Sequence, residues 1–406
     1  MVRNPKGMRD ILPPETFKWR RLEILLSKVA LLYGYGEIRT PILEFGELFR
    51  KGLGDESDVA LKEMYEFVDK NGDVLSLRPE GTAPVARAVI QHHLYDVPVL
   101  RLFYTGPMFR RERPQAGRYR QFHQFGIEAF GVSEPYMDVE VLLVVKRIFD
   151  LLGLPLTIHI NSLGCDECRP PYIEQLRNFV VESIPDDEEI ERFKKNPLKL
   201  FDSKRPEHAQ VKSDAPKILE YLCPTCRDHY AEVIKAARTF AIPIVEDPHL
   251  ARGFDYYTRT VFEGYVGELN LAVVGGGRYD HLVSFYGGPD IPGIGFAIGL
   301  ERLITSMQEV PKVDPEPKVS YFLATTGQDM IEPAFWLAES LRDHNAEVIM
   351  DLRQGKLQKQ LKLADKVDAR YALILGEEEQ KNHAVTLRDM VTGEQRVIAQ
   401  EAVLGE

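Results

Sequence analysis

Apolar residues recur at helical spacing near the start of the chain. Residues 14–33 are predicted to form a helix whose apolar stripe faces a core, and that stripe consists of Leu22, Leu25, Val29 and Leu32. Pro13 and Pro14 suit the beginning of this helix, because proline is favoured at the first helical position. The glycines of "YGYGE" end it, and the following segment "EIRTPILE" is predicted to be extended.

Strand patterns dominate the next part of the chain. The segments "VPVLRLFYTGPMFRRE" and "RQFHQFGIEAFG" are predicted to form a long hairpin, and a helix over residues 136–151 and a strand "LTIHINS" follow. Strands resume in "YYTRTVFEGYV" and "LNLAVVGGGRYD", and "PGIGFAIGLERLITSM" is typical of a strand, a glycine turn and a helix. Residues from about 165 to 240 are instead helical, charged and cysteine-bearing. We therefore predict an α+β domain of mainly antiparallel strands with a helical insertion at about 165–240.

A proline-rich segment separates this region from the end of the chain. Residues 309–318, "EVPKVDPEPK", contain three prolines and alternating charges, which is typical of a linker between domains. Strand, helix, strand, helix and strand patterns then alternate. We predict a first domain at 1–317 and a second, α/β domain at 318–406 with a parallel or mixed sheet.

Composition limits the class of protein. The chain has 406 residues, 44% hydrophobic and 28% charged, which is typical of a globular protein of two or three domains. It contains no run of about 18 apolar residues, and its start lacks the apolar core of a secretory signal, so we expect a cytoplasmic protein without a membrane span. A net charge of −11 argues against broad adhesion to nucleic acid but allows a local basic surface.

Such a basic surface is predicted between the two strands of the hairpin. The segment "FRRERPQAGRYRQFHQ" places five arginines between Phe109 and Arg120. A guanidinium donates two parallel hydrogen bonds to phosphate and stays charged. Glu112 could accept from a base amine, and Phe109, Tyr119 and Phe122 could stack on a purine. The alternative is a solvated basic hairpin without a ligand.

Four other segments are candidates for binding residues. Glu80 and Thr82 of "LRPEGTAPVAR" could bind a ligand or only form a turn with a helix-capping threonine. The tyrosines of "ARGFDYYTRTVFE" could hydrogen-bond a small polar ligand or belong to an ordinary aromatic strand. The glycines of "VVGGGRYD" allow close backbone approach but match no dinucleotide or P-loop motif. Arg302 in "GIGFAIGLERL" could hold a second phosphate or be a buried structural arginine.

The four cysteines form two C-x₂-C pairs. The segments "CDEC" and "CPTC" hold Cys165, Cys168, Cys223 and Cys226, and four thiolates in this pattern suit a closed tetrahedral zinc site. Zinc there would tie the ends of the helical insertion together. Buried reduced thiols and a redox pair are the alternatives.

Together these motifs resemble the class II aminoacyl-tRNA synthetases, and within that class the histidine-specific family. "FRRERPQAGRYRQFHQ" is similar to the second class motif, "GIGFAIGLERL" to the third, and "GYGEIRTPILE" lies where the first, a dimer-interface element, is expected. "ARGFDYYTRTVFE" and "GGGRYD" resemble the two histidine-specific peptides. The resemblance implies an enzyme, a histidine–tRNA ligase, with L-histidine, ATP with Mg²⁺ and tRNA(His) as partners. It also implies a homodimer and an anticodon-binding C-terminal domain. It does not cover the cysteines.

The resemblance also implies a role for individual residues. The residues expected to bind ATP are Arg110, Glu112, Arg118, Phe122 and Arg302. Those expected to bind histidine are Glu80, Gly81, Thr82, Gln124, Glu128, Arg252, Tyr256 and Tyr257. Arg110, Arg252 and Arg302 would be catalytic through the phosphates, and Arg113 and Gln115 would contact the tRNA acceptor end. On the predicted helix of the second domain, a lysine face could contact phosphate or be merely solvated: Lys356, Lys359, Lys362 and Lys366.

Two other functions are compatible with parts of the sequence. A synthetase-like regulatory subunit of ATP phosphoribosyltransferase would be expected to lack the C-terminal domain and to have lost catalytic arginines, whereas both are present here. A non-catalytic RNA-binding module would not explain the histidine-specific peptides.

Overall fold

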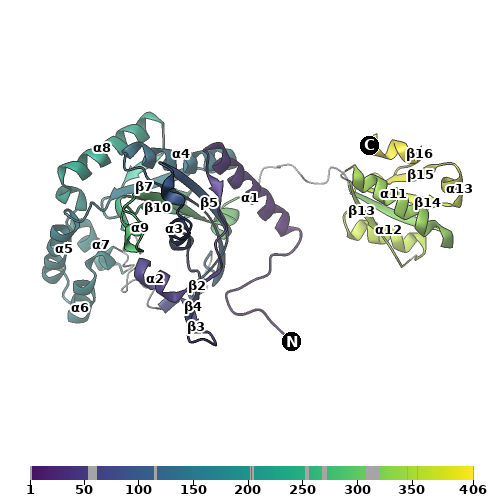
Figure 1. The fold of residues 1–406 in the computed structure, drawn as a ribbon. Coiled ribbons are helices and arrows are strands. Elements are labelled where there is room, and N and C mark those ends of the chain that lie inside the picture. The colour runs from purple at the N-terminus through teal and green to yellow at the C-terminus, as the bar shows by residue number, and fades with distance from the viewer. Residues whose placement is uncertain are drawn as a thin grey trace. The chain divides into compact units, whose positions relative to one another are not determined.

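The structure is a computed structural model that describes residues 2–53, 62–113, 117–201, 203, 205–251, 256–267, 272–307, 320–344, 346–353 and 355–405. The chain divides into two compact units, Met1–Lys312 and Val313–Glu406 (Figure 1). The expected linker at 309–318 lies outside the described residues.

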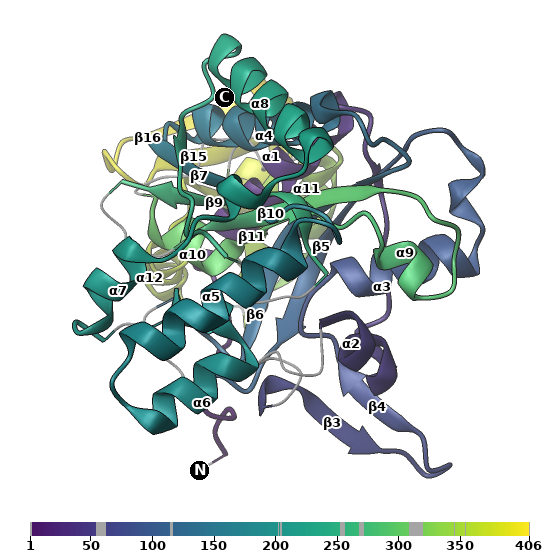
Figure 2. The ribbon, with the colours of Figure 1, turned by 90° about the vertical axis from the view of Figure 1, so that its left-hand side faces the viewer.

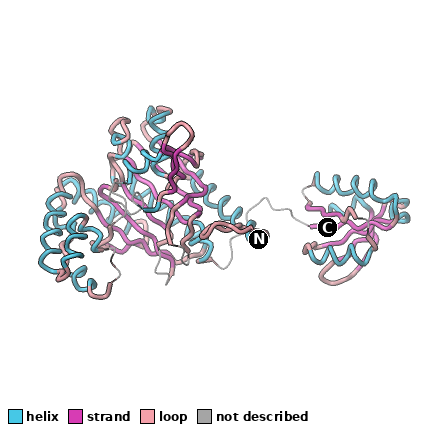
Figure 3. The backbone as a smooth tube through the Cα atoms, turned by 90° about the horizontal axis from the view of Figure 1, so that it is seen from below, coloured by secondary structure: helices cyan, strands magenta, loops and turns pink. Residues whose placement is uncertain are grey.

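An eight-stranded sheet forms the centre of the first unit, with helices around the strands (Figure 3). Its order is β1-β5-β6-β11-β10-β9-β7-β8. Neighbours are antiparallel except for β1 with β5 and β7 with β8, at the two edges, so the prediction of a mainly antiparallel sheet is confirmed. The strands are β1 (Gly36–Glu37), β5 (Leu100–Phe109), β6 (Gln121–Phe130), β7 (Leu156–Ser162), β8 (Ile244–Glu246), β9 (Thr258–Val266), β10 (Val274–Arg278) and β11 (Gly293–Gly299).

Three long helices pack with one face of this sheet in a single hydrophobic core: α1 (Glu15–Leu32), α4 (Pro135–Leu152) and α8 (Pro224–Thr239). Figure 2 shows α8 and α4 side by side. Phe125 and Ile127 of β6 and Phe296 of β11 belong to the same core. The predicted apolar stripe of the first helix is confirmed except for Leu32, the last residue of α1, which is exposed.

Smaller elements complete this unit on the other face. Helix α3 (Thr82–Gln91) and the short α9 (Leu282–Phe285) share a second core with β5 and β9. A three-stranded antiparallel sheet has the order β2 (Leu43–Phe45), β4 (Val74–Leu77) and β3 (Tyr65–Val68). The remaining elements are α2 (Gly46–Leu53), η2 (Leu94–Asp96) and α10 (Leu300–Thr305).

A group of helices extends from the eight-stranded sheet between β7 and α8 (Figure 1). They are α5 (Arg169–Ser183), α6 (Asp187–Lys195), η3 (Pro197–Leu200), α7 (His208–Asp214) and η4 (Ile218–Tyr221). The predicted insertion also included α8, but α8 packs against α4, where His229 contacts the buried Asp138 at 3.1 Å. The projecting part therefore lies between the two cysteine pairs.

The second unit has a five-stranded mixed sheet of order β13-β12-β14-β15-β16. The predicted alternation is confirmed in β12 (Ser320–Thr326), α11 (Ile331–Asp343), β13 (Glu347–Met350), α12 (Leu357–Lys366) and β14 (Tyr371–Gly376). The sequence patterns did not indicate the rest: η5 (Gln328–Met330), α13 (Glu377–Lys381), β15 (Ala384–Asp389), β16 (Gln395–Ala399) and η6 (Gln400–Gly405). Tyr321 and Leu323 pack with α11 whereas Phe322 and Ala324 pack with α12, so the two helices cover opposite faces.

Candidate active site

A cavity of about 430 Å³ collects most of the predicted site residues. Ten of them line it: Glu80, Thr82, Arg110, Glu112, Arg118, Phe122, Gln124, Tyr256, Tyr257 and Arg302. Glu128 is buried in contact with Thr82, and Arg113 is exposed. Arg252 and Gln115 lie outside the described residues.

The register of β6 places side chains in the cavity. Successive residues of a strand point to opposite faces, so Phe122, Gln124 and Glu128 share one face while Phe125 and Ile127 enter the core behind. Gln124 lies opposite Gly299 of β11, and Glu128 lies opposite Gly295. A Cβ on Gly295 would stand 2.0 Å from a carboxylate oxygen of Glu128, so this position has room only for glycine.

Glu80 caps the helix that closes one side of the cavity. Its carboxylate accepts hydrogen bonds from the backbone N–H groups of Thr82 at 2.6 Å and Ala83 at 2.8 Å, at the start of α3. The helix dipole favours a negative charge there. Burial nevertheless raises the pKa of Glu80, against these two hydrogen bonds. The sequence suggested Thr82 as the cap, but Glu80 performs that task, and the Thr82 hydroxyl donates to Glu128 instead.

Three hydroxyl groups converge on the buried carboxylate of Glu128. Thr82 donates to Oε1 at 2.7 Å, Tyr104 donates to Oε1 at 3.4 Å, and Tyr279 donates to Oε2. Burial raises the pKa of Glu128 to about 8, because the hydrogen bonds only partly offset the loss of water. A carboxyl group in this state can exchange its proton with a ligand near neutral pH.

Gln124 presents an unused acceptor to the cavity. Its side-chain oxygen is buried and has no hydrogen-bond partner among the described residues. A buried amide oxygen without a partner is costly, so it indicates a position for a donor supplied by a ligand.

Two arginines are held at the hairpin side of the cavity. Arg110 donates through Nε to the backbone oxygen of Pro79 at 2.9 Å, and its guanidinium lies over the Phe122 ring, 5.3 Å from the centroid. Arg118 contacts the carboxylate of Glu112 at 3.3 Å, and Arg110 is 3.8 Å from the same side chain. Glu112 therefore partly neutralises two cations that would otherwise repel each other.

A third arginine comes from the strand-to-helix transition after β11. Arg302 donates to the backbone oxygens of Ala272 at 2.6 Å and Gly117 at 3.3 Å. Burial lowers the pKa of Arg302, with the nearby Arg118 adding to the effect, but a guanidinium remains charged at any physiological pH. These bonds orient the side chain and leave a fixed charge in the cavity.

An aromatic wall faces Glu128. The rings of Tyr256 and Tyr257 lie 4.7 Å apart, and Tyr256 meets Tyr279 edge-on at 5.9 Å. Burial raises the pKa of Tyr256, Tyr279 and Tyr104 well above its usual value, so these hydroxyls stay protonated. Tyr104 and Tyr279 were not among the predicted site residues. Tyr279 lies in the "GGGRYD" motif, whereas nothing in the sequence around Tyr104 indicated more than a strand.

Other lining residues also escaped prediction. The Glu301 carboxylate accepts from the backbone N–H of His123 at 2.9 Å and contacts its ring nitrogen at the same distance. Asn196, Leu198 and Lys199 reach the cavity from the helical insertion. The insertion was predicted as a separate element, and no motif connected it with the site.

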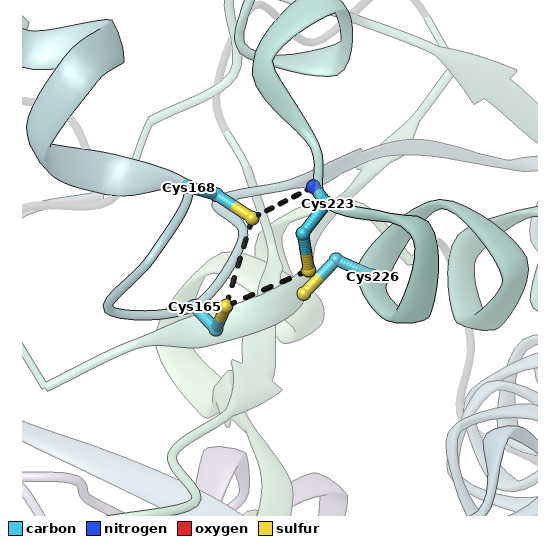
Figure 4. A group of neighbouring side chains, drawn as sticks. All are labelled: Cys165, Cys168, Cys223 and Cys226. Atoms are coloured by element: carbon cyan, nitrogen blue, oxygen red, sulfur yellow. Dashed lines mark hydrogen bonds between the residues drawn. The ribbon is translucent and has the colours of Figure 1, made fainter.

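The four cysteines form a second site apart from the cavity lining. All four sulfur atoms lie within 4.8 Å of one another (Figure 4). Within the described part of the chain, this is the one group of three or more histidine, cysteine, aspartate or glutamate side chains that could hold a metal ion. The Sγ atoms of Cys165 and Cys168 are 3.6 Å apart, and those of Cys165 and Cys223 are 3.9 Å apart.

The cavity has two chemically different regions. Fixed arginine charges suit the phosphates of a nucleotide, and the adjacent buried hydroxyl and carboxyl groups suit a small polar ligand.

Within the described residues no helix is long and apolar enough to cross a membrane.

Comparisons with known proteins agree with this arrangement. A family described as "Histidyl-tRNA synthetase" matches residues 7–165 and 188–303, and "Anticodon binding domain" matches residues 321–406. The histidine–tRNA ligase of Natranaerobius thermophilus is 42% identical over 403 residues, which cover 97% of this chain and 96% of that protein. That of Aquifex aeolicus is 44% identical over 400 residues, 97% of this chain and 98% of the relative.

Solved structures give the same picture. Apo histidyl-tRNA synthetase of S. aureus has a TM-score of 0.82 and 34% identity, covering 100% of this chain and 99% of that one. An ATP phosphoribosyltransferase regulatory subunit/histidyl-tRNA synthetase from Bacillus halodurans has a TM-score of 0.68 and 21% identity, over 93% of this chain and 98% of that one, which shows a common fold alone. The full-length identity above 40% to histidine–tRNA ligases does not favour the regulatory alternative. From its sequence, fold and cavity, the chain belongs to the histidyl-tRNA synthetase family.

Proposed function

We propose that the chain is a histidine–tRNA ligase, which activates L-histidine with ATP and transfers the histidyl group to tRNA(His). The observation that carries the proposal is the cavity, where buried hydroxyl and carboxyl groups suited to an imidazole lie beside three fixed arginines suited to phosphates. Full-length similarity to histidine–tRNA ligases supports the same activity.

Glu128 is proposed to recognise the imidazole ring. A neutral imidazole donates one N–H and accepts at the other nitrogen, and Glu128 with Tyr257 would supply the matching groups. Thr82 and Tyr279 already orient the Glu128 carboxylate, so it is positioned before the ligand arrives. An apolar amino acid in this position would leave buried polar groups unpaired, and the site would reject it.

The α-amino group is proposed to lie between Glu80, Thr82 and Gln124. The free acceptor of Gln124 and the carboxylate of Glu80 supply two places for an ammonium group. Gly81 allows this part of the cavity to form, because the ring of Tyr104 occupies the space that any side chain on residue 81 would need. Arg252, which lies outside the described residues, is proposed to bind the histidine carboxylate and the α-phosphate.

ATP is proposed to bind along the arginines. Arg110 would hold the α-phosphate, Arg302 the γ-phosphate, with Arg118 assisting, while Glu112 and Phe122 would contact adenine. An oxygen of the histidine carboxylate attacks the α-phosphorus, the bond to the bridging oxygen breaks, and pyrophosphate leaves. This step needs no general base, because the attacking carboxylate is already ionised. Positioning and charge neutralisation carry the rate.

Two metals belong to the proposal. Carboxylates of Glu63, Glu263 and Glu301 line the cavity, so oxygen donors of the kind that Mg²⁺ prefers are present near the phosphate region. Mg²⁺ bound with ATP would neutralise phosphate charge. A structural Zn²⁺ is assigned to the four cysteines, which do not line the cavity.

Contacts with tRNA are proposed on both units. Arg113 and Gln115 would meet the acceptor end, which accepts the histidyl group at its terminal adenosine. The second unit matches an anticodon-binding domain and would bind the anticodon. Its exposed lysines are placed to contact phosphates: Lys356, Lys359, Lys362 and Lys366.

We propose a cytoplasmic homodimer. Five apolar side chains of the small sheet are exposed in the single chain: Leu43, Phe45, Phe67, Val68 and Val74. Such a group favours burial against a partner, and this sheet adjoins the segment that resembles the dimer motif. Sedimentation of the wild-type chain and of Phe45→Glu tests it, with the variant expected to dissociate.

The test of the activity is histidine-dependent exchange of labelled pyrophosphate into ATP. The wild-type chain should catalyse exchange, and Arg302→Ala should lose it at least 100-fold because a phosphate contact is removed. Arg113→Ala is the matched control: exchange should persist while tRNA charging falls. A correctly folded chain without exchange would contradict the proposal and favour the regulatory function.

A further inference from the structure

The four-cysteine cluster has the dimensions of a closed zinc site. A tetrahedral ion with Zn–S bonds of about 2.3 Å places its sulfur atoms about 3.8 Å apart. The observed Sγ separations of 3.6 and 3.9 Å lie on either side of this value, and a disulfide would need roughly 2.05 Å. Cys168 and Cys226 are buried and the other two half-buried, so no position is open to a substrate.

The cluster lies at the N-termini of two helices. Cys168 immediately precedes α5 and Cys223 immediately precedes α8, so the positive ends of two helix dipoles meet at the cluster (Figure 4). The backbone N–H of Cys223 also donates to Sγ of Cys168 at 3.1 Å. This bond already joins the two halves of the site, which are 55 residues apart in sequence.

The cluster is connected to the histidine pocket through the backbone. Leu163 donates to the carbonyl of Arg259 at 2.7 Å, and Arg259 donates to the carbonyl of Gly164 at 2.7 Å. These two bonds join the loop that precedes Cys165 to the start of β9, directly after Tyr257. The position of the cluster is therefore fixed relative to the catalytic sheet.

The insertion that the cluster closes reaches back to the cavity. Asn196, Leu198 and Lys199 of this insertion line the cavity. The ring of Phe201 stacks on His249 at 5.1 Å, which holds the same turn against the segment leading to Ala251, another lining residue. Lys199 thus adds a cation to a cavity whose other described cations come from the hairpin and from Arg302.

We infer that Zn²⁺ bound by Cys165, Cys168, Cys223 and Cys226 holds the helical insertion in place so that Lys199 contributes to ATP binding. The zinc site stands on the cysteine geometry alone, whereas the role of Lys199 rests on the proposed ligase function. Lys199 is a positioning group for the phosphates, and zinc acts on the reaction only through it and its neighbours.

Metal content tests the site itself. Full-length protein purified without added zinc should contain one zinc per chain by mass spectrometry, and Cys168→Ser/Cys226→Ser should contain none. Because this variant could fail to fold, zinc is also removed from the wild-type chain with an organomercurial and a chelator, then restored. Folded protein without stoichiometric zinc would overturn the site.

Kinetics of pyrophosphate exchange test the role. Lys199→Ala should raise the KM for ATP about tenfold with a smaller change in the KM for histidine. Lys195→Ala is the matched control, because Lys195 is exposed in the same insertion and does not line the cavity. Zinc removal should raise the KM for ATP in the wild type and have little further effect in Lys199→Ala.

The outcomes separate the two proposals. Zinc that is present but whose removal leaves the KM for ATP unchanged would overturn the role and keep the site. An unchanged KM in Lys199→Ala would also overturn the role. Absence of exchange in zinc-loaded wild-type protein would contradict the ligase function while metal content still reported on the site.

Discussion

Replacement of Glu128 by glutamine should make the catalytic unit more stable at neutral pH and remove its activity. Glutamine keeps the shape of the protonated side chain but has no proton to lose. The native environment raises the pKa of Glu128 from 4.5 to about 8. Between these values the native state binds more protons than the unfolded chain, so the contribution of Glu128 to stability is present at low pH and is lost as pH rises.

The size of this pH-dependent change in stability follows from the rise in the pKa of Glu128. At about 1.4 kcal/mol per pKa unit, the rise in the pKa of Glu128 from 4.5 to about 8 corresponds to roughly 5 kcal/mol. From pH 5 to pH 7 the wild-type chain should lose about 2.5 kcal/mol relative to Glu128→Gln. Glu128 is fully buried, so solvent screening does not reduce this figure appreciably.

The chain allows a direct measurement of the catalytic unit. It contains two tryptophans, Trp19 buried in α1 and Trp336 exposed in α11, so Trp336→Phe leaves a fluorescence signal from the catalytic unit alone. Urea unfolding at pH 5, 6 and 7 in this background gives the free energy of unfolding of wild type, Glu128→Gln and the exposed control Glu174→Gln.

The same pH dependence of the free energy of unfolding in both proteins would refute the reasoning. If the free energies of unfolding of wild type and Glu128→Gln differ by the same amount, within about 0.5 kcal/mol, at pH 5 and pH 7, then folding does not raise the pKa of Glu128. The KM for histidine in Glu128→Gln should rise at least 100-fold, because the amide places an N–H donor where the carboxyl group has its second oxygen and cannot become negatively charged.

Three further predictions concern buried or half-buried groups of the first unit. Gly295→Ala should abolish exchange in a folded chain, because the added Cβ would stand 2.0 Å from the Glu128 carboxylate, and circular dichroism checks the fold. Asp138→Asn should lower the free energy of unfolding by about 3 kcal/mol or more, measured with urea, because it leaves the buried Arg278 without its 3.0 Å ion-pair contact. Arg302→Lys should restore less than a tenth of the exchange lost in Arg302→Ala, since lysine cannot form the fork of bonds that Arg302 makes to two backbone carbonyls.

Periodic patterns predicted most of the fold. Alternation located β5 and β6, and helical spacing located α1 and α4, because each of these elements buries one face in the core. Strands β15 and β16 were not foreseen because they lie toward the edge of a small sheet, where β16 exposes most of its residues. The pattern also could not show that α8 belongs to the helix layer rather than to the insertion, since that depends on its contact with Asp138.

The site was predictable where function requires particular residue types in a short segment. Arg110, Glu112 and Arg118 stand together in one hairpin, and charge density marked them. Tyr104 and Lys199 gave no such signal, because each joins the cavity only through the packing of distant elements. A strand tyrosine and a helix-end lysine look ordinary until the fold brings them to Glu80 and the arginines.

The strand register of the β5–β6 hairpin has a consequence for length variation in the gene. Arg110 follows the end of β5, and Gln124 and Glu128 lie on one face of β6, so one register sets both the nucleotide and the amino-acid contacts. A deletion of one codon within β6 would turn Gln124 or Glu128 toward the apolar core and exchange them for Phe125 and Ile127. Length changes should therefore be excluded from these strands.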